Sequence, residues 1–402
     1  MNGPALDDPV QLHTTPTYSL WQLASYFLKL GTLGFGGPVA LVGYMRRDLV
    51  EKRGWITEAD YKEGLALAQL APGPLAAQLG IYLGYVHYRV LGATVAGLAF
   101  IMPSFVMVVG LALAYTSFGG LSWMQAVFYG VSASVIGIIA FSAYKLTNKT
   151  LGRNRLLWAI FLVSVIITVL TESEQVFLFL AAGILVWLVK APPRYWRVKP
   201  KNTNLSAFSL LALVTDSVPA VSSGAGLLWD IFVYFAQAGA FVFGSGLAIV
   251  PFLYGGLVND NHWLTNQQFV DSVAVAMITP GPVVITTGFI GFLVASFPGA
   301  CVAALATFLP CYLITVIAAP YFHKYGKLPG IKAFVNGVTA AATGAITGSV
   351  IVLGRRTLVD IPTGLLAIIT LGVLWRFKKV PEPLIVLGAA LVGLAIYPLV
   401  RP

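Results

Sequence analysis

The chain has 402 residues, of which 58% are hydrophobic and 10% are charged, and its mean hydropathy is +0.83. Soluble domains carry roughly 25% charged residues, so this composition excludes an ordinary soluble protein and indicates an all-α polytopic membrane protein in contact with the lipid bilayer. The formal net charge is +10. Nucleic acid is not the expected partner, because the basic residues stand in short clusters between apolar runs, as they do when they set membrane orientation.

The N-terminal tail, residues 1–17, contains two aspartates and three prolines and has no basic segment before an apolar stretch. We therefore expect no cleavable signal peptide, and the first membrane helix serves as the targeting element. The two cysteines, Cys301 and Cys311, lie ten residues apart without a CxxC pattern or histidines at metal-binding spacing. This spacing predicts packing roles for them, no metal site and no cofactor.

An internal repeat decides the domain organisation. At an offset of 208, residues 26–80 align with residues 234–288 without a gap, and beyond that region the repeat continues at an offset of 207. The identical pairs include Tyr26/Tyr234, Trp55/Trp263 and Pro72/Pro280. The sequence thus predicts two homologous halves, residues 18–191 and 229–402. The linker between them, residues 192–228, contains a weak candidate for an extra membrane crossing at 205–222.

Taken in chain order, residues 18–33 are expected to form a helix that ends at Gly34-Phe35-Gly36-Gly37. Pro38 can open the next helix, since proline suits the first helical position. A third helix begins after Thr57 and ends at Pro72-Gly73-Pro74, and further helices are expected over 74–89, 92–115, 122–145, 156–170 and 176–189. Each half therefore contains two broken, re-entrant hairpins, followed by helices that cross a hydrocarbon core of about 30 Å.

The distribution of charge favours an inverted relation between the halves. In half one every basic cluster can face the cytoplasm, and the acidic loop at Glu172 and Glu174 lies outside. If half two is inverted, six basic residues face the cytoplasm and only Arg355 and Arg356 lie outside, whereas a parallel repeat reverses that tally. The positive-inside rule therefore predicts an inverted repeat, which requires an odd number of crossings between the halves.

The repeated breaks are candidate anion sites. A helix N-terminus offers unpaired backbone N–H groups and roughly half a positive charge, and glycine lets an anion approach the backbone closely. If the tips meet near the membrane midplane, they form a polar pocket for a small oxyanion. The alternative is that these small and polar residues only permit close helix packing. The candidate substrate-binding residues are Gly36, Gly37, Pro38, Gln69, Pro72, Gly73, Pro74, Gln78, Gly244, Ser245, Gly246, Thr279, Pro280, Gly281, Pro282 and Thr286.

Four charged residues are candidates for gating or coupling. Glu63 and Asp271 are repeat partners, each nine residues before the first proline of its tip, which is ~13 Å along a helix. Each can relay protons or can simply be an acidic residue near a helix start. Lys29 can attract an anion or extend its amine to the membrane surface. Arg46 belongs to the basic patch Arg46, Arg47, Lys52 and Arg53, which either gathers anions at a cytoplasmic mouth or only determines topology.

Enzymatic chemistry has little support in the sequence. It contains no Walker loop and no HExxH motif, its four histidines are scattered, and spacing alone assembles no Ser/His/Asp triad. The chain is therefore predicted not to be an enzyme.

Several motifs in this order carry a family resemblance: Phe35-Gly36-Gly37-Pro38, Gly54-Trp55-Ile56-Thr57, Ala71-Pro72-Gly73-Pro74, Phe243-Gly244-Ser245-Gly246 and Pro280-Gly281-Pro282. Across nearly its whole length the chain resembles the chromate ion transporter family in its long, two-domain form. The resemblance implies a multi-pass exporter of chromate in the bacterial cytoplasmic (inner) membrane, driven by the membrane potential or the proton gradient, that confers chromate resistance. It also implies antiparallel halves.

Alternatives remain within this interpretation. The tips respond to charge and size, so sulfate or another oxyanion can replace chromate as the substrate. An anion channel needs the same pocket without closed states on each side. Both a monomer and a homodimer remain open.

Overall fold

The computed structural model describes residues 17–35, 37–118, 122–172, 176–192, 225–240, 249–325, 328–377, 380 and 382–400. Within these ranges the regular elements are helices and none is a strand, which confirms the all-α fold class. The predicted crossing at 205–222 lies outside the described residues, as do Gly36, Gly244, Ser245 and Gly246.

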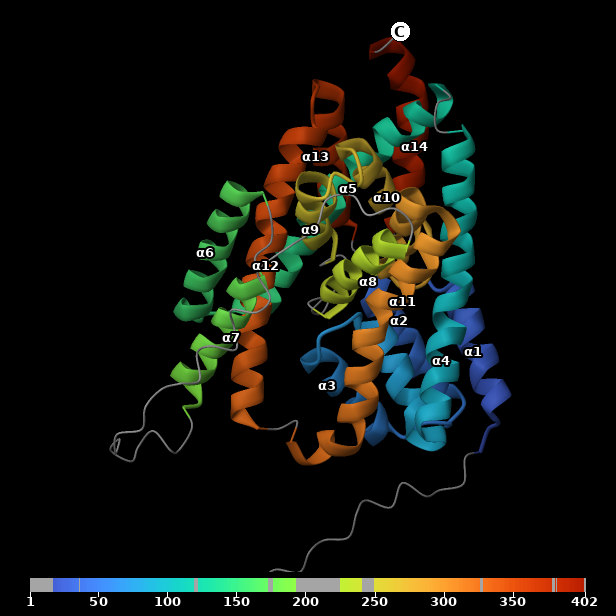
Figure 1. Ribbon diagram of the computed structural model, residues 1–402, viewed down its shortest axis with the longest axis vertical. Coiled ribbons are helices and arrows are strands. Elements are labelled where there is room, and N and C mark those ends of the chain that lie inside the picture. Colours follow the sequence, from blue (N-terminus) through green and yellow to red (C-terminus); the bar gives the residue numbers. More distant parts are fainter. Residues whose placement is uncertain are drawn as a thin grey trace, which may run out of the picture.

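Both halves contain the same succession of helices (Figure 1). The first half runs through α1 (Leu20–Leu33), α2 (Gly37–Met45), η1 (Arg46–Lys52), α3 (Glu58–Leu70), α4 (Leu75–Phe118), α5 (Ser122–Leu151), α6 (Arg155–Thr171) and α7 (Val176–Lys190). The second runs through α8 (Ala225–Ala240), α9 (Ile249–Tyr254), η5 (Gly255–Asp260), α10 (Asn266–Ile278), η6 (Val283–Ile285), α11 (Thr286–Tyr325), α12 (Pro329–Thr357), α13 (Ile361–Arg376) and α14 (Glu382–Val400).

Matching local signals start the matching helices. Thr57 caps α3 by accepting a hydrogen bond from the backbone N–H of Asp60, and Thr265 caps α10 by accepting one from Gln268. In α10 the Gln268 side chain returns a bond to the cap backbone and completes a capping box. In α3 the shorter Asp60 side chain instead accepts a bond from the Thr57 hydroxyl at 2.6 Å. Both re-entrant helices thus begin where the sequence predicts.

The long helices α4 and α11 each contain a sharp reversal. Arg89 has φ 52° and ψ −140°, and Ser296, its repeat counterpart, has φ 53° and ψ −152°. The two limbs of α4 pack closely, since a Cβ added to Gly84 would lie 2.3 Å from the carbonyl oxygen of Gly92. The predicted division between the helices at 74–89 and 92–115 is therefore found at Arg89.

The hydrophobic helices suit a membrane. Among the described helices, five stretches are long and apolar enough to cross one: Leu75–Phe118, Trp123–Leu151, Val283–Phe322, Pro329–Thr357 and Glu382–Val400. Large apolar side chains are exposed on the outer helices, such as Leu170, Ile368 and Leu391. In lipid such exposure is favourable, because the surrounding acyl chains are apolar as well.

The halves interlock rather than lie side by side as separate domains. Helix α5 of half one packs against α13 and α14 of half two, and α12 of half two packs against α6 and α7 of half one. Close glycine contacts make this exchange tight. A Cβ added to Gly130 would lie 2.8 Å from the Cα of Gly393, and one added to Gly337 would lie 2.9 Å from the Cα of Gly183. Helices α5, α7, α12 and α14 are thereby held against the opposite half.

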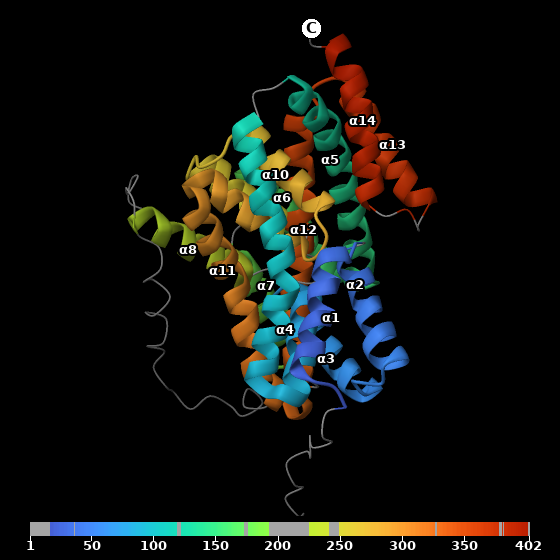
Figure 2. The same cartoon turned by 90° about the vertical axis from the view of Figure 1, so that its right-hand side faces the viewer.

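The re-entrant helices of the two halves lie toward opposite ends of the long axis. Helix α3 is low and α10 is high in both views (Figures 1 and 2). At the end of α6, Glu172 forms an ion pair with Arg356 of α12, and its carbonyl oxygen accepts a hydrogen bond from Asn259 of η5. Glu172 therefore lies beside η5 of half two.

Candidate functional site

The first hairpin tip follows the end of α3. Gly73 has φ +139°, a conformation that side-chain-bearing residues rarely adopt, so glycine is required for the turn. A Cβ added at Gly73 would lie 2.4 Å from the Cβ of Cys311 and 2.7 Å from Nε2 of Gln78. Because Cys311 belongs to α11, the first tip is seated against the long helix of half two.

The second tip is held by half one. Gly281 has φ +94°, and its backbone N–H donates a hydrogen bond to the carbonyl oxygen of Gly34 at 3.0 Å. The Ser104 hydroxyl of α4 donates to the carbonyl oxygen of Pro280 at 2.8 Å. A Cβ added at Gly281 would lie only 2.0 Å from that Ser104 oxygen. Both the turn and the surrounding helices therefore exclude a side chain.

The two tips occupy equivalent seats. Ser104 and Cys311 are repeat counterparts at an offset of 207, and each directly follows a proline inside its long helix. Each tip thus reaches across the interface to the same position of the opposite half. The first tip contacts α11 of the opposite half, and the second contacts α4 and the end of α1.

Of the polar side chains predicted beside the breaks, Gln78, Thr279 and Thr286 form hydrogen bonds within the protein. Gln78 is fully buried and donates from Nε2 to the carbonyl oxygen of Pro72 at 2.7 Å, whereas Gln69 is exposed. Thr279 and Thr286 donate their hydroxyl protons to the backbone carbonyls of Val275 and Ser272 at 2.7 and 2.8 Å. In this conformation these threonines therefore have no proton left for an anion. Their role as direct donors, which their position near the tip had predicted, is not evident here.

The acidic repeat partners differ in their surroundings. Asp271 is 3% exposed and accepts hydrogen bonds from the Tyr115 hydroxyl at 2.8 Å and from Gln267 Nε2 at 2.7 Å, with Ser132 at 3.5 Å. Glu63 is only half-buried. Helices α4, α5 and α10 thus converge on Asp271, which is buried between them.

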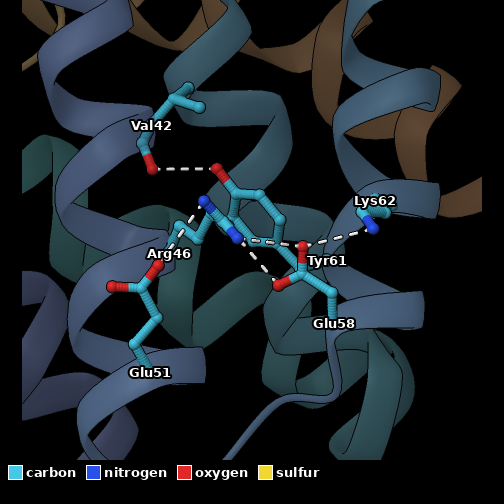
Figure 3. A network of polar contacts seen from close by, with 6 residues as sticks. All are labelled: Val42, Arg46, Glu51, Glu58, Tyr61 and Lys62. Atoms are coloured by element: carbon cyan, nitrogen blue, oxygen red, sulfur yellow. Dashed lines mark hydrogen bonds and ion pairs between the residues drawn. The ribbon is translucent and has the colours of Figure 1, made fainter.

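Arg46 joins η1 to the start of α3 (Figure 3). Its guanidinium donates to Glu58 at 3.2 and 3.4 Å and lies 3.4 Å from Glu51, while Lys62 also pairs with Glu58. The Tyr61 hydroxyl adds a bond to the carbonyl of Val42 at 2.9 Å. Hydrogen bonds from Arg46, and then from Lys62, outweigh the opposing effect of burial and hold the pKa of Glu58 below its usual value. Arg46 therefore fastens η1 to α3.

The rest of the basic patch surrounds a cavity of about 570 Å³, bounded by α1, α2 and η1. We refer to it as the basic cavity, and its polar lining consists of Tyr26, Lys29, Gly34, Tyr44, Arg47, Asp48, Lys52 and Arg53. Of these, the sequence indicates Lys29, the neighbouring turn and the basic patch to which Arg47, Lys52 and Arg53 belong. The structure adds Tyr26, Tyr44 and Asp48; the only sequence signal for Tyr26 is its identity with Tyr234 in the repeat. In the described part of the chain, no three His, Cys, Asp or Glu side chains gather as metal ligands would.

Comparison with known proteins agrees with the repeat. The chromate transporter family model matches residues 21–187 and 229–394. A "Chromate transport protein" of Cupriavidus metallidurans is 66% identical over the full length of both chains. A "Probable chromate transport protein" of Synechococcus elongatus is 64% identical over 96% of this chain and 98% of the relative. A "Chromate transport protein" of Pseudomonas aeruginosa is 29% identical over 95% of this chain and 94% of the relative. No solved structure matches the chain. The two matched segments, the duplicated helices and the full-length relatives together show that this membrane protein belongs to the chromate transporter family.

Proposed function

We propose that this chain is a secondary transporter that exports chromate from the cytoplasm across the bacterial cytoplasmic membrane. The names of the full-length relatives support chromate as the substrate. The proposed mechanism rests on one observation: each tip packs against the opposite half. Gly73 contacts α11, and Gly281 contacts α1 and α4. A broken segment at the interface of two halves changes its surroundings whenever the halves move relative to each other, as alternating access requires.

The oxyanion binds at the N-termini that the tips create. Helix α4 starts directly after Pro74, and η6 with α11 starts after Pro282, so backbone N–H groups and the positive ends of helix dipoles point toward each break. In the present conformation the N–H of Gly281 is bonded to Gly34 and is closed to an anion. Separation of Gly281 from Gly34 would free this donor, and the same movement would open the second tip to substrate.

An inverted repeat is part of the proposal, and two observations support it. Helices α3 and α10 lie toward opposite ends of the molecule (Figure 1), and Glu172 pairs with Arg356. In a parallel repeat the ends of α6 and α12 that carry these residues would face opposite sides of the membrane. Labelling with a membrane-impermeant thiol reagent in a background without native cysteines tests this. Asp260→Cys is expected to react from outside the cell and Lys52→Cys only after lysis; labelling of both from the same side contradicts inversion.

The transport test uses cells loaded with chromate. Gly73→Val and Gly281→Val are expected to abolish efflux, since both positions combine a positive φ with a close neighbour. Gly110→Val is the matched control, because a Cβ added there meets nothing within 4 Å. Normal efflux by both tip variants at normal expression contradicts binding at the tips.

Chromate uptake by oriented membrane vesicles tests the direction and the specificity of transport. Inside-out vesicles should accumulate chromate and right-side-out vesicles should not. Flux that saturates with chromate concentration and is inhibited by sulfate supports a carrier for tetrahedral dianions. Flux that rises linearly to high concentration indicates a channel instead.

A further inference from the structure

We propose that the basic cavity is a second binding site for a tetrahedral oxyanion, which receives the anion before it reaches the second tip. The identity of the anion rests on the proposed chromate transport. The site itself rests on the charge, the unpaired groups and the position of the cavity.

The cavity carries an excess of positive charge. Lys29, Arg47, Lys52 and Arg53 oppose the single carboxylate of Asp48, which leaves a net charge of +3. Burial by itself would raise the pKa of Asp48, but hydrogen bonds from Arg47 and Lys52 outweigh it and hold this pKa below its usual value. Asp48 is therefore ionised at neutral pH. A concave site with one sign of charge concentrates ions of the opposite sign and raises their rate of association.

Two of the cations are not neutralised by the protein. Arg47 and Lys52 both pair with Asp48, at 3.0 and 3.5 Å, whereas among the described residues Lys29 and Arg53 have no ion-pair partner. The guanidinium of Arg53 lies 5.2 Å from the ring centre of Tyr26 and 4.4 Å from that of Trp55. These contacts hold Arg53 at the cavity wall and leave its N–H groups for an anion.

The second half shows that the fold does not need this charge. The counterparts of Lys29, Arg47, Lys52 and Arg53 are Gln237, Gly255, Asp260 and Asn261. Helix α8 and η5 nevertheless form the same elements as α1 and η1. The cations of half one are therefore not a requirement of the hairpin structure, and their presence in one half makes the two ends of the molecule chemically different.

Tyr26 supplies an independent sign of a missing partner. It lines the cavity and is 6% exposed, and its hydroxyl has no hydrogen-bond partner among the described residues. Its repeat counterpart, Tyr234, donates to the carbonyl oxygen of Leu253 at 3.0 Å. An unsatisfied buried hydroxyl is costly, and an oxyanion in the cavity, reached by a small rotation of the ring, would accept its proton.

The position of the cavity links it to the transport site. Gly34 lines the cavity, and its carbonyl oxygen is the acceptor that holds the N–H of Gly281 at the second tip. An anion in the cavity thus lies beside the turn that must release the tip. When Gly281 leaves Gly34, its freed N–H becomes the next donor available to that anion.

The test measures equilibrium binding of sodium chromate to the purified full-length protein in detergent without added lipid. In Lys29→Gln/Arg53→Asn, each new residue is the one that stands at that place in half two. Its chromate affinity should fall by about tenfold or more, because hydrogen bonds to charged groups are lost. In proteoliposomes its KM should rise by a similar factor, while the maximal rate stays within about twofold, because the tips are intact. Lys62→Gln/Lys149→Gln removes two cations outside the cavity and should bind like the wild type.

Tyrosine variants give a second, milder comparison. Tyr26→Phe should weaken chromate binding by severalfold to about tenfold. Tyr234→Phe should leave chromate binding unchanged, because the Tyr234 hydroxyl already donates its hydrogen bond to the carbonyl oxygen of Leu253. Unchanged binding in both Tyr26→Phe and Lys29→Gln/Arg53→Asn overturns the proposal. So does unchanged chromate binding accompanied by a loss of co-purifying phosphatidylglycerol, which would identify the cavity as a lipid headgroup site.

The Gly281→Val variant distinguishes failure of the proposed binding at the tips from failure of the proposed cavity site. Gly281→Val should still bind chromate in the cavity although it does not transport it. If Gly281→Val transports normally but the cavity variants lose affinity, the tip mechanism fails and the cavity site stands. If Gly281→Val loses all chromate binding, the cavity is not a separate site.

Discussion

Replacement of Gly281 by alanine tests how tightly the second tip is seated in half one. The new Cβ would lie 2.0 Å from the Oγ of Ser104 and 3.2 Å from the carbonyl oxygen of Gly31. Overpacking costs roughly 1–3 kcal/mol, and a non-glycine residue at φ +94° costs roughly 1–3 kcal/mol more. We expect Gly281→Ala to lower the free energy of unfolding by roughly 2–6 kcal/mol and to reduce chromate flux.

The structure also predicts which second substitution relieves the strain. Ser104→Ala alone breaks the bond to the Pro280 carbonyl and should cost about 1–3 kcal/mol. Combined with Gly281→Ala it removes the obstructing oxygen, so the double variant should be more stable than the sum of the two effects by roughly 1–3 kcal/mol. The first tip behaves differently. The atom nearest to a Cβ on Gly73 is the Cβ of Cys311, which Cys311→Ala retains.

Denaturation in mixed micelles with increasing dodecyl sulfate gives the free energies, and chromate flux into vesicles gives the activity. The four single variants and the two double variants make up one double-mutant cycle at each tip. The expected outcome is a favourable coupling between Gly281→Ala and Ser104→Ala and none between Gly73→Ala and Cys311→Ala. Equal coupling at the two tips, or a neutral Gly281→Ala, would show that the tips are not seated as described.

Two further predictions concern polar contacts. Tyr115→Phe removes a donor to the buried Asp271 carboxylate and should lower the free energy of unfolding by about 1.5–3 kcal/mol. Tyr312→Phe breaks a bond between two neutral hydroxyls and should lower it by only about 0.5–1.5 kcal/mol. The opposite order of unfolding free energies would mean that Asp271 is protonated in the folded protein. Because Arg46 lowers the pKa of Glu58, this pair stabilises the protein above the ordinary glutamate pKa of about 4.3, and the benefit is lost as the pH falls through the lower folded pKa. Thermal midpoints of the wild type and Glu58→Gln should therefore differ at pH 7 and converge below about pH 4; a difference that persists there contradicts the pairing.

Much of the helical framework could be predicted from the sequence, because its signals are local. Apolar length indicates membrane helices, Pro72-Gly73-Pro74 breaks one, and Thr57 begins another. The reversal at Arg89 was anticipated only as a gap between two apolar runs. The candidate site was predicted less completely. Proximity in sequence to a break suggested ligand donors such as Thr279 and Thr286, but their hydroxyls are bonded to carbonyls of their own half.

By itself the sequence determined that this is a duplicated helical membrane protein, since composition, a constant repeat offset and proline-glycine breaks do not depend on how the chain packs. Only the tertiary structure decided that Gly281 rests on Gly34 and Ser104, that Gly73 rests on Cys311, and that the basic patch divides into one fastening residue, Arg46, and a cavity. The contacts of the two tips join residues that are far apart in the chain. They arise from the exchange of helices between the halves, and no local pattern records which helix of one half will face a given tip of the other.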